Sequence, residues 1–297
     1  MKILILINAY ANMQAMNSQV RRLREELEKQ GVEVDVRRNG SIPCYVDGEG
    51  NCRVAVEDYA CCIYLDKDKY TSAMMERQGL RLFNGHASIQ ICDDKMETFI
   101  RLSQQGIPMP LTIPAPLCYY PGAAIQKERL DAVAQQLGLP LIIKECAGSL
   151  GAQVYLIPDA ESLYEMDAKL QGTPHLYQQF IAASAGRDIR VIVVGGKVVA
   201  AMKRVSDTDF RSNIDLGGHG EVIDLPPEAA ALCCKAAVAL GLDYCGVDVL
   251  FGQEGFLLCE VNSNAFFEGV EQTTGINVAE QYVNYILTSL QTEKSML

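Results

Sequence analysis

Three residues near the C-terminus, Asp248, Glu260 and Asn262, carry side-chain oxygens that can bind a hard cation. They lie on two strand-like segments, residues 246–251 and 256–262. Successive side chains of a strand point to opposite faces, so Glu260 and Asn262 share one face. If Asp248 pairs with Glu260, two carboxylates and an amide converge there.

The turn between these segments predicts that pairing. The sequence Gln253-Glu254-Gly255 suits a three-residue hairpin loop, whose last position needs the left-handed backbone conformation that glycine adopts readily. Such a loop would pair Gly252 with Phe256. Counting back along both strands then places Asp248 opposite Glu260.

Two carboxylates facing each other in a sheet destabilise it unless a positive charge lies between them. Three hard oxygen donors suit Mg²⁺, whose remaining positions can be filled by water and phosphate. The alternative is that Asp248 and Glu260 are solvated on an open face of the sheet. The strongly apolar neighbouring residues favour the metal site.

Two lysines are candidate phosphate ligands. Lys144 ends an apolar strand-like run and precedes the small-residue sequence Ala147-Gly148-Ser149-Leu150-Gly151, whose backbone amides could approach a phosphate. The alternative for Lys144 is a solvated strand end. Lys95 falls in the first turn of a predicted helix, which is unfavourable unless an anion lies nearby.

A polar loop, residues 209–213, presents Arg211 followed by Ser212 and Asn213, and a guanidinium suits a carboxylate or a phosphate. An ordinary surface loop would have the same composition. Asp188, Arg190 and Arg204 lie on a second predicted hairpin, where structural ion pairs are the alternative to a functional role.

The order of elements predicts two kinds of sheet. Residues 2–38 form a β-α-β pattern, with Asn17 and Ser18 as the expected helix cap, and imply a parallel sheet. A turn at residues 48–51 separates two short strands, and a strand at 60–65 and a helix at 70–77 follow. Asp94 should cap the next helix, which puts a domain boundary near residue 93.

Beyond this boundary we expect antiparallel strands with helices, an α+β arrangement. The predicted elements are helix 125–137, strands 139–145 and 175–181, hairpins 188–204 and 246–261, and helices 226–240 and 276–290. The phosphate-binding motifs of P-loop and Rossmann proteins are absent. Any phosphate site must therefore be built differently.

Composition excludes several classes of protein. The 297 residues carry a net charge of −11, which argues against a protein that coats nucleic acid. No apolar run approaches the roughly 18 residues of a membrane span. The eleven cysteines include adjacent pairs and no Cys-x-x-Cys, so we expect reduced thiols, no zinc site and a cytoplasmic protein.

Taken together, these segments resemble the ATP-grasp superfamily and, within it, the RimK-like carboxylate-amine ligases. The resemblance extends over about residues 80–290. Its matching segments are residues 92–95, 106–110, 142–144, 177–181, 186–190, 209–213, 246–248, 260–264 and 271–275. It implies an N-terminal domain at 1–93 and an ATP-grasp domain at 94–297, with a small lobe at about 115–180 and a large lobe at about 181–297 that clasp ATP.

The family pattern also implies residue roles. Lys95 and Lys144 would bind phosphate, Asp188 would lie near the ribose, and Arg211, Ser212 and Asn213 would contact phosphate and the acyl group, with Arg211 and Asn213 catalytic. The backbone of a linker segment would bind adenine; this segment consists of Gln178, Gln179, Phe180 and Ile181. Gln179 departs from the glutamate of related sequences. Asp248, Glu260 and Asn262 would hold one or two Mg²⁺ ions, or Mn²⁺ in their place.

The implied reaction is formation of an amide bond through an acyl phosphate, with ATP consumed and ADP released. An amino acid such as glutamate, or a peptide, is the expected carboxylate, and an amine is the acceptor. The resemblance also implies self-association, and the composition predicts neither nucleic acid nor membrane partners. The alternatives are a peptide-modifying macrocyclase and a nucleotide-binding sensor without turnover.

Overall fold

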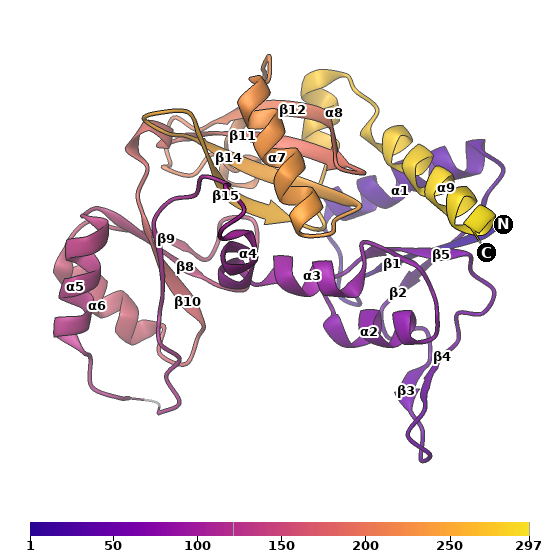
Figure 1. Ribbon diagram of the computed structural model, residues 1–297, viewed down its shortest axis with the longest axis horizontal. Helices are drawn as coiled ribbons and strands as arrows, with labels where there is room; N and C mark the ends of the chain where they lie inside the picture. The colour runs from indigo at the N-terminus through magenta and orange to yellow at the C-terminus, as the bar shows by residue number, and fades with distance from the viewer. Residues whose placement is uncertain (121, 297) are drawn as a thin grey trace.

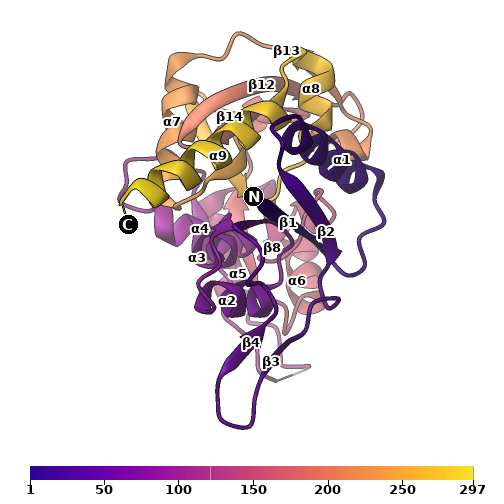
Figure 2. The ribbon, with the colours of Figure 1, turned by 90° about the vertical axis from the view of Figure 1, so that its right-hand side faces the viewer.

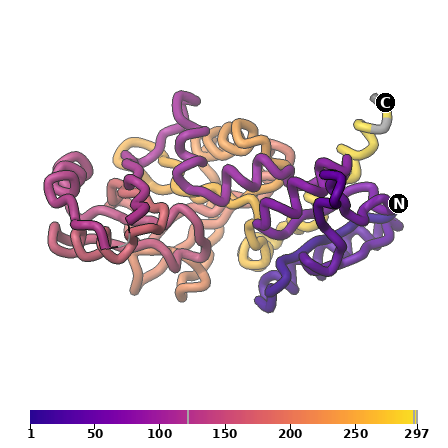
Figure 3. Tube along the Cα trace, turned by 90° about the horizontal axis from the view of Figure 1, so that it is seen from below, coloured from indigo at the N-terminus to yellow at the C-terminus, as the bar shows by residue number. Residues whose placement is uncertain are grey.

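The computed structural model describes residues 1–120 and 122–296 and contains three larger sheets that follow one another along its longest axis (Figures 1 and 3). The first is parallel, and its strands are ordered β2 (Glu33–Arg38), β1 (Lys2–Ile7), β5 (Cys61–Leu65), β6 (Leu82–Phe83). Strands β1 and β5 are almost continuously apolar and buried, as expected of strands covered on both faces. The predicted β-α-β unit is confirmed.

The helices of this first part are α1 (Gln14–Lys29) and α2 (Lys69–Arg77), and a small hairpin, β3 (Cys44–Val46) and β4 (Cys52–Val54), projects from it (Figure 2). The predicted cap at Asn17 and Ser18 is wrong, because α1 begins three residues earlier. Ser18 is buried and donates a hydrogen bond to Glu268 Oε1 at 2.8 Å instead. The Ser18 hydroxyl, which we expected to cap the helix, therefore makes a tertiary contact instead.

Two short helices connect the first sheet to the rest of the chain. Helix α3 (His86–Asp93) was not predicted, and α4 (Lys95–Leu102) follows it directly. The predicted cap is confirmed, since the Asp94 carboxylate accepts hydrogen bonds from the backbone of Met96 and Glu97. The expected domain boundary at residue 93 falls at this junction.

The second sheet is antiparallel, and its strands are ordered β7 (Thr112–Pro114), β10 (His175–Gln179), β8 (Leu141–Glu145), β9 (Val154–Ile157). Helices α5 (Lys127–Leu137) and α6 (Ala160–Lys169) pack on it through a core that includes Leu130, Leu163 and Tyr177. This is the small lobe, on the left of Figure 1. Strand β9 and helix α6 were not predicted.

The third sheet is also antiparallel, and its strands are ordered β13 (His219–Val222), β12 (Lys197–Val205), β11 (Arg187–Val194), β14 (Tyr244–Phe251), β15 (Phe256–Asn262). Helix α7 (Pro227–Ala239) covers one face. Helices α8 (Glu268–Thr274) and α9 (Val278–Met296) pack on the other. Two single-turn 3₁₀ helices, η1 (Ala182–Ser184) and η2 (Ile214–Leu216), lie in loops of this large lobe.

Helix α9 joins the large lobe to the first sheet. One hydrophobic cluster contains Ile5 of β1, Leu23 of α1, Ile192 of β11 and Ile286 of α9. Figure 2 shows α1 and α9 near each other above the parallel sheet. Because a shared core crosses residue 93, the division into two domains stays a prediction. Within the described ranges, no helix is both long and apolar enough to cross a bilayer.

Candidate active site

The β14–β15 hairpin brings the predicted metal ligands together. Asp248 pairs with Glu260, and Gly246 pairs with Asn262, as the sequence predicted. The predicted loop is wrong, however, because Phe256 pairs with Phe251 rather than with Gly252. The register shifts by one residue between Asp248 and Val249, and this bulge restores the predicted pairing deeper in the sheet.

The bulge places two consecutive side chains in one pocket. Cys259 and Glu260 both line it, although regular alternation would send them to opposite faces. The Lys144 ammonium lies 3.5 Å from Cys259 Sγ. Burial raises the pKa of the Cys259 thiol, and the nearby Lys144 charge only partly opposes this effect. Strand alternation gave no sign that Cys259 would belong to the site.

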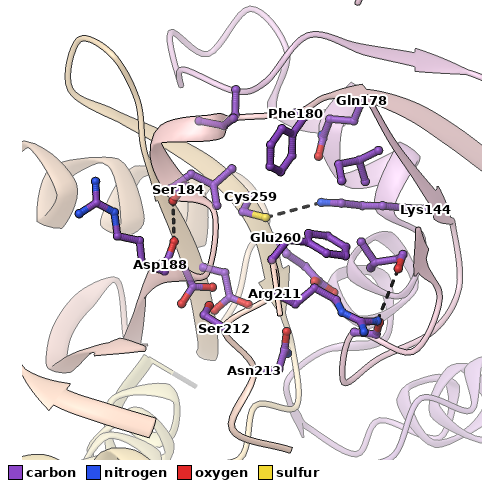
Figure 4. A pocket seen from close by; sticks show the side chains of 18 of the residues that line it. Lys144, Gln178, Phe180, Ser184, Asp188, Arg211, Ser212, Asn213, Cys259 and Glu260 are labelled. Carbon is purple, nitrogen blue, oxygen red and sulfur yellow. Dashed lines mark hydrogen bonds between the residues drawn. The ribbon is translucent and has the colours of Figure 1, made fainter. Parts of the chain in front are cut away.

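This pocket lies between the small and large lobes (Figure 4). Nine of the predicted ATP-binding residues line it: Lys144, Gln178, Gln179, Phe180, Ile181, Asp188, Arg211, Ser212 and Asn213. Apolar walls from Ile142, Phe180 and Leu250 suit a flat aromatic base, whereas Lys144 and Arg211 supply positive charge for phosphates. The pocket therefore has the two kinds of surface that a nucleotide requires.

Lys95 does not line this pocket. Its ammonium donates a hydrogen bond to the Gly148 carbonyl at 3.1 Å and lies 3.7 Å from Glu260 Oε1. The side chain is buried, so Glu260 is the anion that offsets its unfavourable position in the first helical turn. Direct contact between Lys95 and a nucleotide remains a prediction.

Arg211 links the loops of the two lobes. Its guanidinium donates to the Gly151 carbonyl at 2.6 Å and pairs with Asp209 at 2.7 Å. Gly151 has φ +75°, and a Cβ at this position would meet Asn213 Oδ1 at 3.0 Å. Glycine thus allows the small-residue loop to approach Asn213 closely.

Two guanidinium groups lie in ion-pair contact with the predicted metal ligand Asp248. Arg190 Nε lies 2.6 Å from its Oδ1, and Arg204 Nη2 lies 3.0 Å from its Oδ2. Arg204 also donates from Nε to Asp188 Oδ1 at 2.7 Å. Burial opposes ionisation of Asp248, but the two guanidinium groups outweigh it and keep the pKa of Asp248 below its usual value.

The donor set fits magnesium. Asp248 Oδ1 is buried and lies 2.6 Å from Arg190 Nε, but no described residue donates a hydrogen bond of good geometry to it, so a lone pair remains for a cation. In the part of the chain that the structure describes, no three His, Cys, Asp or Glu side chains gather into a metal site. Two carboxylates and one amide would leave several positions of the shell to water and phosphate oxygens, as Mg²⁺ prefers.

A second pocket lies between the parallel sheet and the large lobe. Asn8, Asp66 and Lys67 reach it from the carboxyl ends of β1 and β5, where open parallel sheets commonly bind ligands. Asn262 lines this pocket too, together with Asn264 and Glu268. The sequence analysis did not predict that Asn8, Asp66 and Lys67 belong to the site. Their position as polar residues directly after two buried strands was a usable signal. The two pockets share Arg204, Asn213, Asp248 and Glu260.

Comparison with known sequences identifies the family. Residues 92–286 match the model of the RimK-like ATP-grasp domain. A probable alpha-L-glutamate ligase 1 from Shewanella sp. (strain MR-4) is 40% identical over 225 residues, which cover 74% of this chain and 71% of that protein. Beta-citrylglutamate synthase B from Danio rerio is 33% identical over 77% of this chain. The match spans only 56% of the zebrafish protein.

Solved structures support the same fold. A RimK domain ATP-grasp protein from Sphaerobacter thermophilus superposes with a TM-score of 0.71 at 21% identity and covers 95% of this chain and 98% of its own. D-alanine–D-alanine ligase from Bacillus anthracis has a TM-score of 0.74 at 18% identity, with complete coverage of both chains. The expected fold class is confirmed, and the chain belongs to the RimK-like ATP-grasp family.

Proposed function

We propose that the protein is an ATP- and magnesium-dependent ligase that joins a carboxylate to an amine and releases ADP and phosphate. The observation that supports this proposal is that the two pockets meet at Asn213, Asp248 and Glu260. A nucleotide in the first pocket can direct its terminal phosphate toward a carboxylate in the second. The family membership supports the same reaction class.

The chemistry explains why two adjoining pockets are needed. A free carboxylate is a poor electrophile, so its oxygen first attacks the γ-phosphorus of ATP and ADP leaves. The amine then attacks the resulting acyl phosphate, the amide bond forms, and phosphate leaves with the former carboxylate oxygen. No nucleophilic side chain is required; the protein supplies positioning and charge.

The residues of the nucleotide pocket divide these tasks. Lys144 and Arg211 stabilise the phosphates, Asn213 orients the acyl group, and Asp188 lies near the ribose. The backbone of residues 178–181 contacts adenine. Bound magnesium would neutralise charge on the transferring phosphoryl group, with Asp248, Glu260 and Asn262 as its protein ligands. One or two ions, or manganese in their place, suit this donor set.

Exclusion of water is the remaining requirement, because an acyl phosphate hydrolyses readily. The loop of residues 147–151 lies against Asn213 through Gly151 and is tied to the large lobe by Arg211. We assign it as the lid of the nucleotide pocket. Its opening would admit ATP, and its closure would protect the intermediate.

L-Glutamate is the first substrate to test, because several relatives are named glutamate ligases. A peptide carboxylate is the second, which would make the enzyme peptide-modifying.

The eleven cysteines are free, in keeping with a reducing cytoplasm. Self-association remains part of the proposal, as does the absence of nucleic acid and membrane partners.

The test is ADP release and hydroxamate formation in the presence of hydroxylamine, a small nucleophile that traps acyl phosphates. Carboxylates are varied first, beginning with glutamate, other amino acids and acidic peptides. We expect hydroxamate and ADP to form in step with a subset of carboxylates, and Glu260→Gln to abolish both. Tight ATP binding without either product would favour the sensor. A rate of ADP formation that does not depend on the carboxylate would indicate a simple ATPase.

A further inference from the structure

Each predicted metal-binding carboxylate already has a protein cation beside it. Asp248 lies in ion-pair contact with Arg190 at 2.6 Å and with Arg204 at 3.0 Å. Glu260 lies 3.7 Å from the buried Lys95 ammonium. The charges that would attract a free divalent cation are therefore partly neutralised within the protein.

The wider balance of charge points the same way. Arg204 is shared with Asp188, and Lys144 approaches the neutral thiol of Cys259. The ion pairs at the junction of the two pockets join three cations, Arg190, Arg204 and Lys95, to three carboxylates, Asp188, Asp248 and Glu260. The charges of these six side chains cancel, in a region where burial weakens solvent screening, so they leave no net negative charge to attract a free cation.

We propose that Arg190 and Arg204 are built-in counter-ions that exclude free divalent metal from Asp248 and Glu260 until a nucleotide is bound. This inference rests on the proposed function, since it takes these carboxylates as the metal ligands. The phosphates of the nucleotide supply the negative charge that attracts the metal, and the metal enters together with them. The guanidinium groups also hold the Asp248 carboxylate in place, so the site is preformed without metal.

Arg190 is the better residue to test. It lies on β11 directly opposite Asp248, and the only ion pair it makes with described residues is to that carboxylate. Arg204 also anchors Asp188, so its removal would disturb two carboxylates. Arg190→Gln removes one positive charge and keeps a polar side chain that can still donate a hydrogen bond to Asp248.

The experiment is a titration with Mn²⁺, followed by the electron paramagnetic resonance signal of the free ion. Wild-type protein is titrated alone and with ADP, and ADP without protein is titrated too, because the nucleotide itself binds Mn²⁺ in solution. Arg190→Gln and Arg190→Lys are titrated alone. Lys203→Gln is the matched control, because Lys203 precedes Arg204 on β12 and pairs with the exposed Glu221. Circular dichroism melting verifies that each variant is folded.

We expect wild-type protein to bind Mn²⁺ at least about tenfold more tightly with ADP than alone. Arg190→Gln should bind Mn²⁺ alone at least about tenfold more tightly than the wild type does, because one repelling charge is gone. Arg190→Lys keeps the charge and should exclude the ion as the wild type does. Lys203→Gln should be unchanged.

Two results would overturn the inference: wild-type protein that binds Mn²⁺ equally well with and without ADP, or Arg190→Gln that excludes the ion as strongly as the wild type. If Arg190→Gln does not fold, Lys95→Gln tests the same charge balance through Glu260, with the same expectation. Failure of the wild type to bind Mn²⁺ even with ADP would instead contradict the proposed function. The two failures are therefore distinguishable.

Discussion

Among the described residues, each lobe contains an arginine–aspartate cluster around a buried carboxylate, and the clusters compared, at Asp167 and Asp248, differ in how completely these carboxylates are satisfied. In the small lobe, Asp167 accepts hydrogen bonds from Tyr177 and from Arg129 at 2.9 Å, and His175 lies within 3.6 Å. Burial opposes ionisation, but these partners lower the pKa of Asp167 to about 2.

The large-lobe cluster is less complete. Asp188 and Asp248 share Arg204, and Asp248 Oδ1 lies 2.6 Å from Arg190 Nε without receiving a hydrogen bond of good geometry from any residue in the described ranges. Glu260 lies across the sheet from Asp248. Arg129, Asp167 and His175 line a separate pocket of the small lobe, whereas Asp248 lines both pockets of the active site. Satisfied charges of this kind stabilise a fold, and unsatisfied ones beside a pocket are available for ligands.

The largest expected effect comes from the unsatisfied cluster. Asp248→Asn should reduce ADP formation by about 100-fold or more, because a metal ligand and its charge are lost. Asp167→Asn is the matched control and should retain most of the wild-type turnover once it is folded. Similar losses in both variants, measured by coupled ADP assay, would remove the distinction between the clusters.

A second pair of variants separates nucleotide binding from chemistry within the large-lobe pocket. Lys144→Ala should weaken Mg²⁺–ADP binding by about 10- to 100-fold, as expected for loss of a charged hydrogen bond. Arg211→Ala should mainly slow turnover, because its charge is assigned to the transferring phosphoryl group. Calorimetry measures the first effect and single-turnover kinetics the second. Lys127→Ala, in the small lobe and over the Tyr164 ring, is the control.

The small-lobe cluster should affect stability instead. Asp167→Asn is expected to destabilise the protein by about 1–3 kcal/mol at neutral pH, since buried hydrogen bonds to a charged group are weakened. A carboxylate whose pKa is lowered by folding contributes its full stabilisation at pH values above the pKa that it has in the unfolded chain. The difference in melting temperature between variant and wild type should therefore shrink as the pH falls from about 4 toward 2.

The smallest effect is expected at Cys259. Cys259→Ser keeps a polar atom near Lys144 and should change the KM for ATP by less than about threefold, since a neutral contact contributes little. Steady-state kinetics measure this change. A loss comparable with that of Lys144→Ala would mean that the thiol has a role beyond packing.

The hairpin shows what the sequence could predict. The pairing of Asp248 with Glu260 was predicted correctly, although the loop that led to it was not. The sequence did not reveal the bulge, because residues 256–259 are apolar without interruption. In such a run, no alternation of apolar and polar residues marks where an extra residue lies. The same bulge put Cys259 into the pocket unexpectedly.

Long-range contacts account for most of what was missed. The second pocket joins residues at the carboxyl ends of β1 and β5 to the loop after β15 and the start of α8; Asn8 and Glu268 are more than 200 positions apart. Ser18, which we expected to cap α1, instead makes such a contact with Glu268. Local propensity carries no information about partners at that separation.

The most direct test of the proposed ligase chemistry is isotope transfer from the carboxylate. With a carboxylate that supports ADP formation and is labelled with ¹⁸O, the acyl-phosphate route predicts that labelled oxygen appears in the released phosphate, together with the amide product. Mass spectrometry of the phosphate measures this directly. Amide formation with phosphate that contains no oxygen from the carboxylate would contradict the account.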